Sequence, residues 1–264
     1  MKKLQLLGAA AAASALTALA ALVGFADAQA NIAPTNTTPP SISGTPRDGE
    51  TLTANEGAWT GDQPITYTYQ WQRCDGNGVN CANLAGATGR TYAVQTSDVN
   101  NRLRVAVTAT NTTGPTTASS QPTAVVTPPE GATRLSDGRY SIPASSVRLP
   151  NRLIISGVEF APSVIRSRAP YTGRFRVTDT RGYIVRDAIV LVTGVPLGWI
   201  QAPQEVRTNV DGLATVQIQP TTRLRLVRGG SMVKFIRARK EGDTLLAGIS
   251  TRRLVRVRTA RPTS

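Results

Sequence analysis

The sequence predicts an all-β protein with two consecutive β-sandwich domains that follow an export signal. Apolar and polar residues alternate with a period of two along several segments, which is the pattern of strands with one buried face. Glycine, proline, asparagine and aspartate recur between these segments at the spacing of tight turns. A proline-rich stretch at residues 127–131 separates two parts of different charge.

Residues 1–28 have the pattern of a signal peptide. Lys2 and Lys3 precede an apolar run from Leu4 to Phe25, and Ala26-Asp27-Ala28 fits the small-x-small cleavage rule. The alternative is an uncleaved membrane anchor, because the run is nearly long enough to span a bilayer. We expect cleavage, and therefore a secreted or envelope-associated protein with no transmembrane segment in its mature chain.

A first domain is predicted at residues 35–127. Tyr67, Tyr69 and Trp71 alternate with polar residues, so one face of this strand is aromatic and buried. The segment from Leu103 to Ala109 repeats the alternation. The predicted core residues are Trp59, Trp71, Leu103, Val105 and Val107.

This first domain resembles the immunoglobulin-like repeats of secreted actinobacterial proteins. The resemblance lies in YxYQWxRC, in GAT, and in DVxxxLRVxVTAxN followed by a glycine. It implies that Trp71 occupies the core position of an immunoglobulin-type third strand. The inter-sheet disulfide of vertebrate domains is absent, so packing around Trp59 and Trp71 must replace it.

The two cysteines enclose a short polar loop. An even cysteine count in an exported chain predicts a disulfide between Cys74 and Cys81. Asp75, Asn77 and Asn80 in this loop are either calcium ligands or turn formers, and the EF-hand pattern is missing. The chain contains no histidine, so we predict no metal site and no cofactor. The aromatic residues Trp59, Tyr67 and Tyr69 can either fill the core or form a sugar-stacking platform; we favour the core.

A linker is predicted at residues 128–140 and a second domain at 141–258. Residues 175–192 read as a hairpin, Asp211-Gly212 marks a tight turn, and later strands are expected at 232–239 and 245–257. The pattern FxVxDxxGxxVxxAxV, followed by DGxAxVxI, resembles invasin-type and transthyretin-like bacterial immunoglobulin folds. We interpret the aspartates as turn formers rather than catalytic or metal-binding groups; these are Asp179, Asp187 and Asp211.

Charge distinguishes the two domains. Residues 31–129 hold five arginines and six acidic residues, whereas residues 130–264 hold 23 basic residues against nine acidic ones, a net charge of +14. This excess either contacts an anionic partner or reflects a compositional preference for arginine at solvated positions. The predicted anion-binding residues are Arg237, Arg239, Lys240, Arg252, Arg253, Arg256 and Arg258.

The same residues disfavour an enzyme. Without histidine there is no Ser-His-Asp or Cys-His catalysis, and no nucleotide-binding fingerprint is present. The sequence therefore predicts a non-enzymatic structural or adhesive protein. The alternative is a module that binds polysaccharide or another acidic polymer and is held to the envelope by its basic C-terminal domain. Sparse aromatic residues disfavour nucleic acid as the partner.

Overall fold

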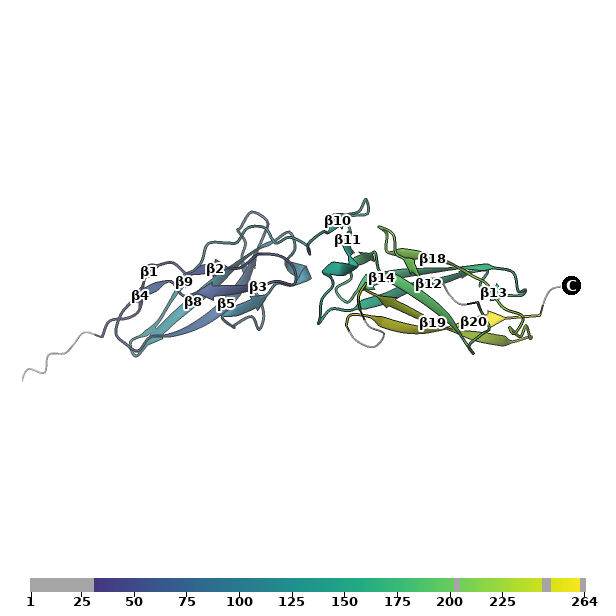
Figure 1. Cartoon of the computed structure of the whole chain (residues 1–264). Coiled ribbons are helices and arrows are strands. Elements are labelled where there is room, and N and C mark those ends of the chain that lie inside the picture. Colours follow the sequence, from purple (N-terminus) through teal and green to yellow (C-terminus); the bar gives the residue numbers. More distant parts are fainter. Residues whose placement is uncertain (1–30, 202–204, 244–247, 262–264) are drawn as a thin grey trace, which may run out of the picture.

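The protein forms two β-sandwich domains placed end to end (Figure 1). The computed structural model describes residues 31–201, 205–243 and 248–261, so the predicted signal peptide lies outside the described residues. The described residues are almost entirely strand and turn, with two single 3₁₀ turns at Thr96–Asp98 and Ala144–Ser146. Two separate clusters of buried hydrophobic residues form the two cores. The prediction of an all-β protein with two immunoglobulin-like sandwiches is confirmed.

The first domain packs a three-stranded sheet against a four-stranded sheet. The smaller sheet has the order β2-β3-β7, with strands Ser41–Ser43, Thr51–Asn55 and Thr91–Ala93. The larger has the order β6-β5-β8-β9, with strands Ala82–Asn83, Thr66–Cys74, Arg102–Asn111 and Gly114–Ser119. A two-stranded ribbon joins β1 (Thr35–Thr38) to β4 (Ala58–Thr60).

The core of the first domain surrounds Trp71. Its side chain is fully buried, stacks on Tyr92 with ring centroids 5.4 Å apart, and donates its indole N–H to the Gly89 carbonyl at 2.9 Å. Leu103, Val105 and Val107 are also fully buried, whereas Trp59 is partly buried at the edge of the cluster. Buried Asp98 accepts hydrogen bonds from Tyr92, Arg73 and the Gln95 backbone. This polar network joins the two sheets where no disulfide crosses them.

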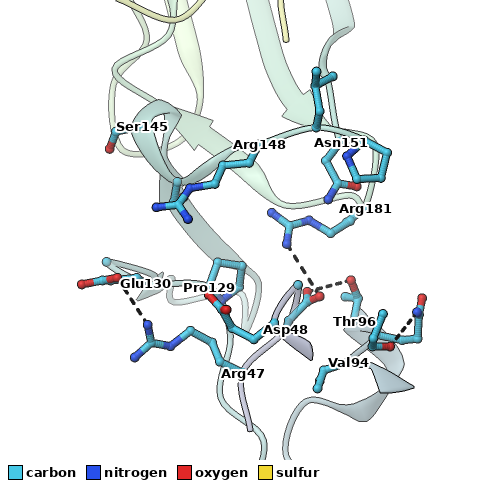
Figure 2. Close-up of a pocket in the computed structure, with 18 of the residues that line it drawn as sticks. Arg47, Asp48, Val94, Thr96, Pro129, Glu130, Ser145, Arg148, Asn151 and Arg181 are labelled. Carbon is cyan, nitrogen blue, oxygen red and sulfur yellow. Dashed lines mark hydrogen bonds and ion pairs between the residues drawn. The ribbon is translucent and has the colours of Figure 1, made fainter. Parts of the chain in front are cut away.

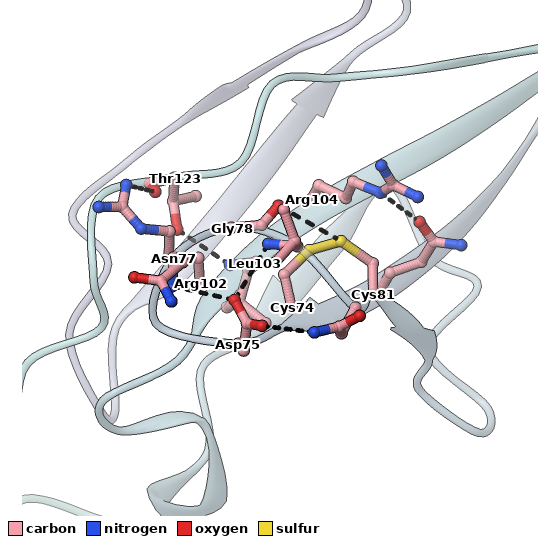
Figure 3. The surroundings of a disulfide bond; sticks show 12 residues. Cys74, Asp75, Asn77, Gly78, Cys81, Arg102, Leu103, Arg104 and Thr123 are labelled. Atoms are coloured by element: carbon pink, nitrogen blue, oxygen red, sulfur yellow. Dashed lines mark hydrogen bonds between the residues drawn. A yellow bond between two sulfur atoms is a disulfide. The ribbon is translucent and has the colours of Figure 1, made fainter.

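The disulfide links Cys74 to Cys81 and closes one local loop, as predicted (Figure 3). Inside the loop, Asp75 accepts backbone hydrogen bonds from Asn77 and Val79 and a side-chain bond from Asn80. The hydrogen bond from the Val79 N–H is the main reason why the pKa of the Asp75 carboxyl lies below its ordinary value. The Asp75 carboxylate therefore accepts hydrogen bonds within its own loop, which supports its interpretation as a turn former rather than a calcium ligand.

Breaking this bridge should destabilise the first domain alone. A loop of this length contributes about 2–3 kcal/mol in the chain-entropy account of disulfides. We expect Cys74→Ser/Cys81→Ser to lower the unfolding free energy of the first domain and to leave the second unchanged. Chemical denaturation followed by the fluorescence of Trp71 and of Trp199 reports on the two domains. An equal loss in both transitions would contradict the local assignment.

The second domain packs two larger sheets face to face. One contains β10, β11, β15, β14, β12 and β18, with strands Thr133–Arg134, Tyr140–Pro143, Ile184–Arg186, Tyr171–Asp179, Leu153–Ala161 and Leu213–Ile218. The other has the order β13-β20-β19-β16-β17, with strands Val164–Ile165, Thr251–Thr259, Gly230–Arg239, Ile189–Val195 and Val206–Arg207. Strand β10 falls within the expected linker and pairs with β11.

The prediction of a hairpin over residues 175–192 is wrong in its second half. Strand β14 turns back into β15 within one sheet, but β16 belongs to the opposite sheet. The chain crosses over at Asp187, which has a φ of 63°. Three buried residues precede Arg186 and three follow Asp187, so the alternation is interrupted here, but the sequence does not show that the next strand joins the opposite sheet. The last strand begins at Thr251 rather than at 245, and residues 244–247 lie outside the described residues.

A lysine lies in the middle of the second core. Lys234 is fully buried on β19 opposite Gly194 of β16. Its Nζ atom lies 5.3 Å from the Tyr171 ring centroid and has no hydrogen-bond partner among the described residues. Burial lowers the pKa of Lys234 to about 7, because the charged amine is poorly solvated there.

This lysine should make the second domain less stable at neutral pH than at alkaline pH. Between pH 7 and its ordinary pKa of 10.5, the unfolded chain binds a proton that the folded chain has lost, so stability rises with pH. Below pH 7 the folded state must hold the buried amine of Lys234 in its charged form, so the destabilisation is complete. We expect Lys234→Met to raise the unfolding free energy there by about 3 kcal/mol and to flatten the pH dependence. Lys240→Met, at a partly exposed position, is the control and should do neither.

A buried carboxylate joins the two domains (Figure 2). Asp48 of the first domain is 5% exposed and accepts a hydrogen bond from Thr96 at 2.8 Å. Arg181, from the turn between β14 and β15, reaches across to Asp48 at 3.6 Å. Arg181 also pairs with Asp179 at 2.8 Å and lies over the Tyr183 ring. A second ion pair joins Arg47 to Glu130 at 3.3 Å.

Removing Arg181 should loosen this joint. Because Arg181→Ala leaves buried Asp48 without its cationic partner, we expect a loss of about 1–3 kcal/mol in unfolding free energy. We also expect a broader distribution of interdomain distances in small-angle X-ray scattering. Arg139→Ala removes an arginine from an exposed pair with Asp137 and should change neither quantity. An unchanged scattering profile for Arg181→Ala would show that other contacts hold the joint.

Candidate anion-binding tip

The charges of the second domain separate along its length. The end that adjoins the first domain holds the joint and its ion pairs, including Arg181–Asp179, Arg186–Asp187, Arg207–Glu241 and Arg239–Glu205. The opposite end holds the loops 166–170, 196–200 and 219–229, and none of these loops contains aspartate or glutamate. The basic residues there have few nearby acidic side chains. The far end of this domain is therefore its most positive region.

Three loops and the end of β20 form this distal tip, which we define as residues 166–170, 196–200, 219–229 and 258–261. Gln219 donates to the Arg168 carbonyl at 3.0 Å, and Arg168 donates to the Leu224 carbonyl at 2.9 Å. Thr221 donates its backbone N–H to the Trp199 carbonyl at 3.0 Å. These bonds hold the loops side by side, so residues far apart in sequence share one surface.

The tip carries seven exposed arginines and no acidic residue. None of the seven forms an ion pair with a carboxylate within the described part of the chain. They are Arg166, Arg168, Arg223, Arg225, Arg228, Arg258 and Arg261. Guanidinium groups with free donors bind phosphate, sulfate and carboxylate groups in two-pronged contacts, which gives the tip the chemistry of an anion-binding surface.

Loop 219–229 orients its arginines by alternating them with anchors. Leu224 is fully buried and Leu226 packs on the core, so the side chains of Arg223 and Arg225 point to solvent between them. The backbone N–H groups of Arg223 and Leu224 donate to the Oγ1 and carbonyl oxygen of Thr221. The arginines are therefore presented from a folded loop rather than from a free chain.

Most of the predicted anion-binding residues lie elsewhere on the domain. Arg237 is 4% exposed and lies beside Ser250, so it does not belong to the exposed surface. Arg239 makes a bidentate pair with Glu205 near the joint, and Lys240 follows it. Arg253 donates to the Ile155 carbonyl at 2.8 Å on the side opposite its neighbours.

The remaining three predicted arginines share one face. Arg252, Arg256 and Arg258 are exposed on alternate positions of β20, as their spacing indicates. Arg258 reaches the distal tip, whereas Arg252 and Arg256 line the outer face of the sheet leading to it. The tip arginines of the loops were missed by sequence reasoning. Two signals were readable: the repeats Arg166-Ser167-Arg168 and Arg223-Leu224-Arg225, and the absence of acids over residues 212–240.

The cleft at the joint is a weaker candidate. It has a volume of about 600 Å³ and is lined by both domains (Figure 2). Its arginines face the acidic residues Asp48, Glu50 and Glu130, two of which are already in ion pairs. The cleft is therefore explained by the domain contact.

The described residues contain no group of three or more cysteine or acidic side chains that could hold a metal ion. Within the same residues, no helix is long and apolar enough to cross a membrane.

Comparisons with known proteins find a likeness only in structure. The chain matches no protein-family model and no curated protein. It is similar to the titin domains Z1Z2, solved in complex with telethonin, at 14% identity over 89% of this chain and all of that chain, with a TM-score of 0.28. It is also similar to the FN1–FN3 domains of chicken CNTN1, at 12% identity over 87% of this chain and 68% of that chain, with a TM-score of 0.34.

Proposed function

We propose that this is a non-enzymatic extracellular attachment protein. The first domain serves as a spacer, and the distal tip of the second domain binds an anionic component of the cell envelope. The observation that carries the proposal is the set of seven exposed arginines on an acid-free tip. Exposed charges of one sign, gathered on one end of a folded domain, attract polyanions over distances of about a Debye length.

Export and the domain boundaries are part of the same proposal. In this proposal, residues 1–28 act as a signal peptide, and the Cys74–Cys81 disulfide is suited to an oxidising compartment outside the cytoplasm. We place the two domains at residues 35–127 and 141–258. The alternative partner, an acidic cell-surface polysaccharide bound by charge, uses the same tip. A polysaccharide held by aromatic stacking would instead use Trp59 and Tyr67, whose ring centroids lie 6.3 Å apart.

Removing three of the seven tip arginines should weaken retention on polyanions. Residues 31–264 contain both cores, and we expect this chain to bind dextran sulfate at low ionic strength. The variant Arg223→Gln/Arg225→Gln/Arg228→Gln should bind roughly 10–100-fold more weakly, at ~1 kcal/mol for each charge near an anionic surface. Salt should weaken binding of the parent chain steeply and that of the variant less.

A matched control separates position from total charge. Arg134→Gln/Arg139→Gln/Arg148→Gln removes the same number of exposed arginines near the joint and should retain binding. Equal losses in both triple variants would show that only net charge matters. Binding that resists salt and is lost on Tyr67→Ala would favour the aromatic alternative.

A further inference from the structure

We propose that the distal tip binds the surface of an anionic lipid bilayer, with Leu197 and Val227 entering the headgroup region. This inference rests on the proposed function and names its partner. The starting observation is that the most basic end of the molecule also exposes large aliphatic side chains. Leu197 is 80% exposed and Val227 is 49% exposed, with Val195 at 44% beside them on the strand end.

The loop that carries Leu197 is held in place by contacts with residues 220 and 221. Thr221 donates its hydroxyl to the Gly198 carbonyl at 2.5 Å, and Ile200 bridges to Pro220. Gly198 has a φ of +83°, so Pro196-Leu197-Gly198 forms a tight turn with Leu197 at its apex. Trp199, one residue further on, is partly buried against the core. The turn therefore directs one aliphatic side chain outward while its neighbours anchor the loop.

An arginine lies near each of these aliphatic groups. A methyl group added at Gly198 would lie 3.2 Å from Arg223 Nη1, so this guanidinium covers the turn next to Leu197. Val227 lies against Gly230, which pairs with Thr259 next to Arg258. Exposed aliphatic groups beside exposed arginines match a bilayer surface, where phosphate groups border the acyl region.

Charge and chemistry argue against the other occupants. A second copy of this chain docked tip to tip would bring seven arginines against seven, with no acidic residue to pair with them. A sugar ligand would favour exposed aromatic faces, and Trp199 is the tip's one aromatic residue among those described. A soluble polyanion would use the arginines but gain nothing from Leu197 and Val227.

Vesicle sedimentation tests the inference directly. Residues 31–264 should bind vesicles that mix phosphatidylglycerol with phosphatidylcholine and should not bind pure phosphatidylcholine. Leu197→Ser/Val227→Ser should weaken vesicle binding on the order of tenfold, because the apolar contact is lost. The same variant should bind dextran sulfate as the parent chain does. The control Leu149→Ser/Val79→Ser changes exposed aliphatic residues away from the tip and should leave both unchanged.

A site-specific probe locates the contact. Both cysteines of the chain are joined in the disulfide, so Leu197→Cys carries a single reactive thiol for an environment-sensitive dye. The emission should shift to the blue on addition of anionic vesicles, and a dye at Val79→Cys should not respond. Retention on dextran sulfate without vesicle binding, or serine variants that bind vesicles normally, would overturn the lipid inference and leave the proposed function standing. No binding to either surface would overturn both.

Discussion

The direction in which the distal tip faces depends on one buried carboxylate. Asp48 loses nearly all of its contact with water, and an ionic group in that position needs partners that replace the lost solvation. Those partners come from both domains: Thr96 from the first and Arg181 from the second. Because Arg181 is itself fixed by Asp179 and Tyr183, the joint aligns the domains end to end and leaves the tip at the far end of the molecule (Figure 1).

The joint also explains why the charges of the second domain are unevenly distributed. Most of its acidic residues lie in turns and ion pairs near the first domain: Asp179 caps the turn that carries Arg181, and Glu205 holds Arg239. The exception is Glu159, which lies on β12 opposite Arg174. Arginines near the first domain are therefore partly neutralised. The distal loops need no such pairs, because Leu224 and backbone hydrogen bonds to Thr221 already fix them. Acidic residues are therefore more frequent near the joint than in the distal loops, and the distal end is more positive.

The sequence predicted those parts of the fold that depend on local periodicity. Alternation along residues 103–109 identified a buried face, and the spacing of Cys74 and Cys81 identified a local bridge. On residues 67–71 the expected buried aromatic face holds for Trp71, whereas Tyr69 is partly buried and Tyr67 is 37% exposed. Two features escaped prediction because they depend on tertiary contacts. The polar pair Arg186-Asp187 between two apolar runs does not show which sheet the following strand joins, and the alternation that points Lys234 inward conflicts with its charge. The tip arginines lie in loops, where no periodicity indicates which segments meet.

The exposed aliphatic residues make the tip partly apolar, which distinguishes it from a surface that is only charged. Solvation by arginine would keep this end of the domain soluble without any exposed leucine, and the core gains no buried area from Leu197. The turn nevertheless contains a positive-φ glycine, Gly198, and accepts a hydrogen bond from Thr221, and both hold that side chain outward. A side chain that contributes little to its own fold but is firmly positioned is suited to contact with something outside the molecule. The nearby guanidinium group of Arg223 is the reason we propose a partner that is both anionic and, at its boundary, apolar.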